Sequence, residues 1–250
     1  MFTTLLLLTI FCASFVLTMV GLGGGLIFSP LFVLLGFPVS TAVSASLFLN
    51  GIAAASAGIT YFRKNMIDIR TALPLLISSS LAAPLGAMLT SRIDLRLFTG
   101  IMAGVVLLAA LRMIFAGKPA SESAEIAYVA KLIGGAIIGL MVGVMAGLLG
   151  IGGGVFIVPL LIYGLKMPTK TAAATSIFIV VFSSFSGFFT HISLAGTDWK
   201  FILLAAIFSF CGGQLGSKIM SEKLKGKAVR RIFGVVLIVF AVKLIQKAFL

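Results

Sequence analysis

The sequence predicts an all-α, polytopic integral membrane protein made of two homologous halves, and three observations support this fold class. Of the 250 residues, 60% are apolar and only 10% are charged, with a mean hydropathy of +1.25. Soluble globular domains carry about 25% charged residues. Long apolar stretches follow one another along the chain, and a glycine-rich motif in the first recurs in the fifth. The composition excludes a soluble globular domain, a disordered chain, a coiled coil and a secreted disulfide scaffold.

The apolar stretches have the lengths expected of membrane-spanning helices. A bilayer core takes about 20 apolar residues per helix, and most of the stretches are close to that length. The first and the fifth are much longer than one span. Each stretch is bounded by charged residues, proline or glycine, and they cover residues 5–37, 42–62, 72–89, 97–115, 132–165, 172–192, 201–219 and 232–250.

Both long stretches are interrupted by glycines in their middle. Glycine accepts positive φ and lets another backbone or a ligand approach closely, so each helix should stop here and a fresh one begin near Leu26 or Val155. A helix over 26–37 would be about 18 Å long, about half a bilayer. We therefore expect it to start near the midplane, with unpaired N–H groups facing the break. The glycines are Gly21, Gly23, Gly24 and Gly25 in the first stretch and Gly150, Gly152, Gly153 and Gly154 in the fifth.

The two breaks belong to an internal duplication. A fixed offset held over a long segment indicates a repeat. The first repeat is expected to cover residues 1–116, a polar linker 117–130, and the second repeat 131–250. An offset of 129 matches Pro30 with Pro159, and an offset of 130 matches Thr41 with Thr171, Ser46 with Ser176, Asp68 with Asp198 and Gly86 with Gly216.

The basic residues favour inverted halves, each with a glycine-broken helical hairpin plus about three membrane-spanning helices. If each long stretch crossed the membrane once, Lys and Arg would divide almost evenly between the two sides. If each enters and returns on the same side, one side carries a clear excess, as cytoplasmic loops do. This model places both termini outside. Its cytoplasmic basic residues are Arg63, Lys64, Arg70, Arg112, Lys118, Lys131, Lys166, Lys170, Lys218, Lys223, Lys225, Lys227, Arg230 and Arg231.

The broken helices are the candidate binding site. A helix N-terminus carries a partial positive charge and free donors, which suit an anion, and broken helices meeting at the midplane are typical of secondary transporters. Close helix packing is the alternative explanation for such glycines, and we assign Gly135, Gly139, Gly143 and Gly147 to packing. Hydroxyl and amide groups near the breaks could also bind the anion, although they could instead bond within or between helices. They are Ser46, Asn50, Thr175 and Ser176.

A second set of candidates lies at the predicted span ends. Asp68 with Arg70, and Asp198 with Lys200, occupy equivalent repeat positions and could act as gates, although helix capping with a local ion pair is the alternative. His191 could carry a proton, with interfacial packing as the alternative. The sequence has no nucleotide-binding motif and no metal-ligand cluster. We therefore expect no cofactor, no nucleic-acid partner and no enzyme activity.

The duplicated G-x-G-G-G-x4-P-L element followed by a Thr-Ala…Ser helix resembles the sulfite exporter TauE/SafE family. The resemblance covers nearly the whole chain. It implies a transporter of small sulfur-containing anions, such as sulfite, thiosulfate or organosulfonates, in the cytoplasmic membrane of a prokaryote. The family's motif positions fall on the break glycines, Pro30, Pro159, Ser46, Thr175 and Ser176.

The function expected from these features is secondary transport of a small anion by alternating access, with the site between the two broken helices at the midplane. A passive anion channel is the alternative, because it would need the same pore chemistry. The expected partners are the anion and the lipid bilayer. Coupling to protons and the oligomeric state stay open.

Overall fold

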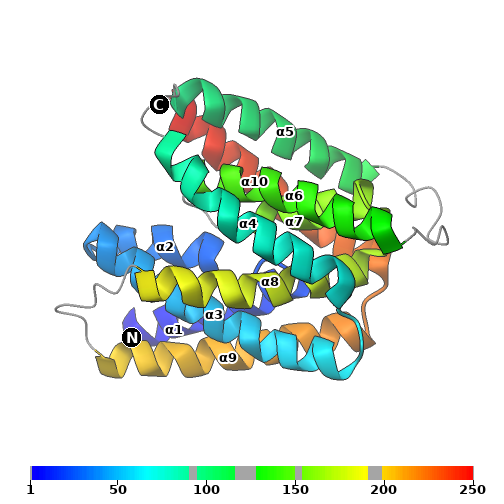
Figure 1. The fold of residues 1–250 in the computed structure, drawn as a ribbon. Coiled ribbons are helices and arrows are strands. Elements are labelled where there is room, and N and C mark those ends of the chain that lie inside the picture. The colour runs from blue at the N-terminus through cyan, green and yellow to red at the C-terminus, as the bar shows by residue number, and fades with distance from the viewer. Residues whose placement is uncertain (1, 90–94, 116–127, 150–153, 191–198, 250) are drawn as a thin grey trace. The chain divides into compact units, whose positions relative to one another are not determined.

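The computed structural model describes residues 2–89, 95–115, 128–149, 154–190 and 199–249. Within these ranges the chain is helical and contains no strand (Figure 1). The helices are α1 (Phe2–Met19), α2 (Gly25–Leu34), α3 (Val39–Arg63), α4 (Ile69–Leu89), α5 (Leu95–Phe115), α6 (Tyr128–Leu149), α7 (Gly154–Tyr163), α8 (Thr169–Thr190), α9 (Trp199–Glu222) and α10 (Gly226–Phe249).

This architecture confirms the all-helical class and the division of the long apolar stretches. Among the described residues, three segments are long and apolar enough to cross a membrane: Ser44–Arg63, Thr169–Phe189 and Lys200–Glu222. Large apolar side chains such as Phe62, Leu81 and Phe189 are exposed on the helix surfaces. Exposed apolar surface on this scale is suited to contact with lipid.

The first glycine break lies where the sequence predicts it. Helix α1 ends at Met19 and α2 begins at Gly25, one residue before the expected start. The backbone reverses through Gly21 and Gly23, whose φ angles are +89° and +71°. L-residues with side chains rarely adopt such angles, so these two positions require glycine.

Helix starts follow the register of the duplication. Helices α2 and α7 begin 129 residues apart, at Gly25 and Gly154. Helices α3 and α8 begin 130 residues apart, as do α4 and α9. Helix α7 thus begins one residue before the start expected near Val155. Residues 150–153, which contain the rest of the second break, lie outside the described residues.

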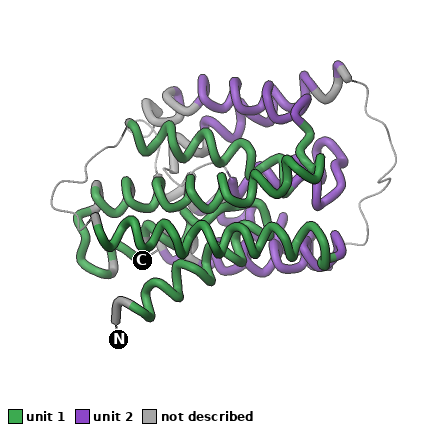
Figure 2. The backbone as a smooth tube through the Cα atoms, turned by 90° about the horizontal axis from the view of Figure 1, so that it is seen from below, with its two compact units in different colours: residues 1–68, 173–224 green, residues 69–172, 225–250 purple. Residues whose placement is uncertain are grey.

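The chain forms two compact units, and each unit draws helices from both sequence halves (Figure 2). Unit 1 consists of residues 1–68 and 173–224, and unit 2 of residues 69–172 and 225–250. Helices α1, α2, α3, α9 and most of α8 belong to unit 1, whereas α4, α5, α6, α7 and α10 belong to unit 2. The halves predicted from the duplication are a different division and remain a prediction.

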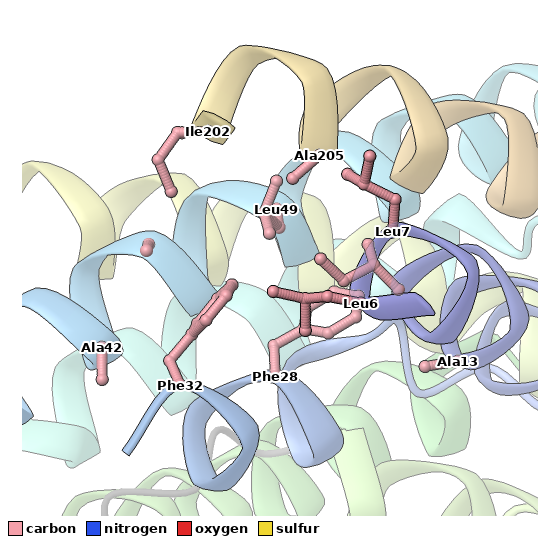
Figure 3. Packing of buried hydrophobic residues seen from close by; sticks show 11 residues of the cluster. Leu6, Leu7, Ala13, Phe28, Phe32, Ala42, Leu49, Ile202 and Ala205 are labelled. Atoms are coloured by element: carbon pink, nitrogen blue, oxygen red, sulfur yellow. The ribbon is translucent and has the colours of Figure 1, made fainter. Parts of the chain in front are cut away.

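In unit 1, α2 turns back toward the start of α1. Phe28 and Phe32 of α2 are fully buried in one cluster with Leu6 and Leu7, which lie near the start of α1. Figure 3 shows Phe28 beside Leu6, with Leu49 of α3 in the same core. The hairpin form expected for the α1–α2 pair from the distribution of basic residues stays a prediction.

Helices α3 and α8, which the repeat makes equivalent, run antiparallel in unit 1. A Cβ added to Gly187 would contact Leu47, and one added to Gly51 would contact Phe185. Farther along α3, a Cβ on Gly58 would contact Val181. Residue numbers therefore fall along α8 as they rise along α3, and the glycines make room for the larger side chains of the facing helix.

In unit 2, three of the four glycines spaced four residues apart in α6 face the backbone of α4, which confirms the packing role predicted for these three. A Cβ on Gly135 would lie 3.1 Å from the carbonyl oxygen of Thr71, and one on Gly139 2.5 Å from that of Leu75. The next glycine, Gly143, faces the carbonyl of Ser79 in the same way.

We expect Gly139→Ala to lower the free energy of unfolding by about 1–3 kcal/mol, because a methyl group there would push the α4 backbone away. The measurement is thermal unfolding of the detergent-solubilised protein. Gly104→Ala in α5 is the matched control, because a Cβ there meets nothing within 4 Å. It should leave stability unchanged or raise it by about 0.5–1 kcal/mol. Equal effects of the two changes would contradict the packing role.

Candidate functional site

The start of α2 lies against the middle of α3 and is held there by Asn50. The backbone N–H groups of Gly24 and Gly25 both donate hydrogen bonds to Asn50 Oδ1, the latter over 2.8 Å. Asn50 is buried and is the twelfth residue of the 25-residue helix α3. The N-terminus of α2 is therefore about 17–20 Å from either end of α3, which agrees with the predicted start near a midplane.

Asn50 also connects the break to α8. Its Nδ2 donates a 2.7 Å hydrogen bond to Oγ of Ser184, whose side chain is buried. A carboxamide has one acceptor oxygen and two donor hydrogens. One side chain thus accepts from the α2 terminus and donates to α8.

Two serines that the repeat makes equivalent bind the carbonyl groups of the break. Ser46 Oγ donates to the carbonyl oxygen of Gly25 over 3.3 Å, and Ser176 Oγ donates to that of Gly21 over 2.7 Å. Both serines are buried. The break therefore receives one serine contact from each predicted half.

These contacts correct one prediction about the site. The N–H groups at the start of α2 were expected to be unpaired, whereas the serine hydroxyls were expected either to bind the anion or to bond within or between helices. In the structure, Gly24 and Gly25 are paired with Asn50, and both hydroxyl hydrogens are directed to backbone carbonyls. The physical reason is that an unpaired backbone group buried away from water costs free energy comparable to a lost hydrogen bond.

The glycines are also required for the close approach of Asn50. A Cβ on Gly25 would lie 3.1 Å from Asn50 Cγ, and one on Gly23 would collide with Asn50 Oδ1. A Cβ on Gly24 would collide with the ring of the fully buried Phe28. The motif thus serves both the backbone reversal and the contact with α3.

Thr175 is not at the break. Its Oγ1 accepts a 3.0 Å hydrogen bond from the backbone N–H of Asp68, in the segment between α3 and α4. Arg70 and Lys200 are exposed in the first turns of α4 and α9. Gly154 is the buried first residue of α7. A gating role for Asp68, Arg70 and Lys200 stays a prediction, and the remaining candidates lie outside the described residues: Gly150, Gly152, Gly153, His191 and Asp198.

Ser184 was not among the candidates predicted from the sequence. A signal for it exists, because Ser176 and Ser184 are eight residues apart and therefore share one face of a helix. The same rule connects Ser46 with Asn50, which are four residues apart on α3.

At one end of unit 1, an ion pair joins the ends of α3 and α9. Lys64 Nζ lies 2.7 Å from Oε1 of Glu222, and both side chains are partly exposed. Arg63 precedes Lys64, and Lys218 lies one helical turn before Glu222. Several basic residues that the sequence assigns to the cytoplasmic side are therefore at the same end of this unit.

Comparison with known proteins gives a consistent family match. The family model described as sulfite exporter TauE/SafE matches residues 6–244. A probable membrane transporter protein, YunE of Bacillus subtilis, is 26% identical over 92% of this chain and 92% of its own length. A probable membrane transporter protein of Xylella fastidiosa is 28% identical over 94% and 92% of the two chains. No solved structure matches the chain significantly.

Proposed function

Because the chain belongs to the sulfite exporter TauE/SafE family, we propose that it is a secondary membrane transporter of small sulfur-containing anions such as sulfite, thiosulfate or organosulfonates. The proposal that the substrate is an anion rests on one observation. Two successive backbone N–H groups at the start of α2 converge on a single oxygen, Asn50 Oδ1, beside the middle of α3. The same geometry at a helix N-terminus suits an anionic oxygen.

In this proposal, Asn50 Oδ1 holds the position that an oxygen of the anion takes during transport. A charged oxygen forms stronger hydrogen bonds with backbone N–H groups than a neutral amide oxygen does. An arriving oxyanion can therefore displace the side chain of Asn50. Once displaced, the Asn50 amide group can donate to the anion itself, together with Ser46 and Ser176, whose hydroxyls lie at the same break.

The proposed mechanism is alternating access between inverted halves. Two observations support it, namely the antiparallel run of the repeat-equivalent helices α3 and α8 and the buried cluster that α2 shares with the start of α1. The second break, at Gly150 and Gly152–Gly154, is proposed to bind the anion as the first does.

We further propose a location in the cytoplasmic membrane of a prokaryote, with both termini outside. The ion pair between Lys64 and Glu222 supports this orientation, because it brings basic helix ends together.

The test is counterflow in liposomes that contain the purified protein. Vesicles loaded with a high concentration of unlabelled sulfite should take up labelled sulfite transiently above its external concentration, with a saturable rate. A transporter exchanges substrate in this way, whereas an open pore does not. Saturable counterflow with sulfite, thiosulfate or an organosulfonate supports the proposal. Uptake without counterflow would favour a channel, and no anion-dependent uptake by any of the three would overturn the substrate class.

A further inference from the structure

A cavity away from the glycine break lies between α3 and α8 in unit 1. Its volume is about 310 Å³, at the lower end of the range for small-molecule sites. Its walls are apolar and include Gly58, Ile59 and Phe62 from α3 and Phe178 and Phe182 from α8. Gly58 contributes no side chain to the space between the two helices, and a Cβ there would be in contact with Val181 across it.

The cavity is shaped for an amphiphile rather than for a small anion. Ile59, Phe62 and Phe182 are 45–58% exposed, so the cavity is an open groove along the helix surfaces. Apart from Arg63 at one end, the described walls carry no polar side chain that could bind an anion. An apolar chain, in contrast, would bury this surface favourably.

The charged end of the groove is Arg63, in the last turn of α3. Arg63 is exposed, and Lys64 beside it is paired with Glu222. A guanidinium group can bind the oxygens of a phosphate through two parallel hydrogen bonds. Basic pockets between membrane helices are suited to anionic lipid headgroups.

We propose that this groove, here called the α3–α8 groove, binds an anionic phospholipid. One acyl chain lies between Gly58, Phe62 and Phe182, and the headgroup phosphate is bound by Arg63. The proposal is independent of the transported substrate, because the groove and the glycine break share no residue. A zwitterionic lipid offers the same chains, so Arg63 should provide a preference for net negative charge.

The test uses tryptophan fluorescence and brominated lipids, which quench tryptophan on contact. The single tryptophan, Trp199, is replaced by Phe, and Phe182→Trp places a reporter in the groove. The protein is reconstituted in phosphatidylcholine vesicles that contain increasing fractions of brominated phosphatidylglycerol or brominated phosphatidylcholine. We expect phosphatidylglycerol to quench the reporter at about fivefold lower mole fraction, the preference that one basic residue can supply.

Three further variants, built in the reporter background, test which residues cause the preference and the quenching. Arg63→Gln should remove the fivefold preference, whereas Lys223→Gln, which deletes an equal charge outside the groove, should retain it. Gly58→Leu should fill the groove and reduce quenching by both lipids, and a Cβ at this position makes only ordinary contacts. Equal quenching by the two lipids in the parent reporter, or a preference that survives Arg63→Gln, would overturn the proposal. No quenching by either lipid would show that protein covers the groove, which also overturns it.

Discussion

Gly23→Ala is expected to reduce anion transport by about 100-fold while the protein still inserts into the membrane. A Cβ at this position collides with Asn50 Oδ1, so Asn50 and the start of α2 cannot keep their present distance. Misplacement of binding groups by about 1 Å can cost a factor of 100 in rate. The measurement is the initial rate of sulfite uptake into liposomes at equal protein content.

The matched control separates crowding from backbone strain. Gly36 also has a positive φ, +83°, but a Cβ there meets nothing within 4 Å. Gly36→Ala therefore carries a similar conformational cost, about 1–2 kcal/mol, without disturbing the contact with Asn50. It should lower the melting temperature but retain transport. If both variants transported at the parental rate, the break would have no part in the mechanism.

Asn50→Asp is expected to lose transport of anions almost completely, by about 100-fold or more, without loss of folding. The new carboxylate has nearly the shape of the amide and can still accept hydrogen bonds from Gly24 and Gly25, now more strongly. It also places a negative charge where the anion is proposed to bind, and like charges brought together in such a site cost several kcal/mol. Uptake rates test the expected loss of transport, and thermal unfolding of the same preparation tests whether the variant is folded.

Ser184→Ala is the control for the hydrogen bond whose direction the carboxylate would change. Asn50 Nδ2 donates to Ser184 in the structure, whereas an ionised aspartate can only accept, so the Ser184 hydroxyl would have to turn and become the donor. Removing the serine hydroxyl alone should reduce transport only severalfold, because a neutral hydrogen bond contributes about 1 kcal/mol. Parental transport by Asn50→Asp would show that no anion binds beside this residue.

The sequence predicted the features that depend on local backbone chemistry. Glycine tolerates positive φ, and the reversal does occur at Gly21 and Gly23, immediately before α2. Spacing of four residues predicted the packing face of α6, and Gly135 and Gly139 do face the α4 backbone. Both predictions needed only the geometry of one segment and its residue types.

Features that depend on contacts between distant segments could not be predicted in this way. Asn50 was a candidate, but its pairing with Gly24 and Gly25 arises because α2 folds back against the middle of α3. Thr175 has the residue type of an anion ligand, yet it binds the backbone of Asp68. The composition of the two compact units likewise follows from tertiary packing, which no sequence offset encodes.

The central claim is that the N–H groups at the start of α2 bind the transported anion. Glycine labelled with ¹³C at the carbonyl and ¹⁵N at the amide gives HNCO signals only from amides that follow another glycine. Two of these amides, Gly135 and Gly213, lie within helices α6 and α9 and serve as internal controls. The full set is Gly24, Gly25, Gly135, Gly153, Gly154 and Gly213.

Sulfite is titrated into the labelled protein in micelles, and the same experiment is repeated with Asn50→Asp. The signals of Gly24 and Gly25 should shift and saturate with sulfite, while those of Gly135 and Gly213 stay in place, and Asn50→Asp should abolish the shifts. Signals of Gly24 and Gly25 that do not move at sulfite concentrations that saturate transport would contradict the account.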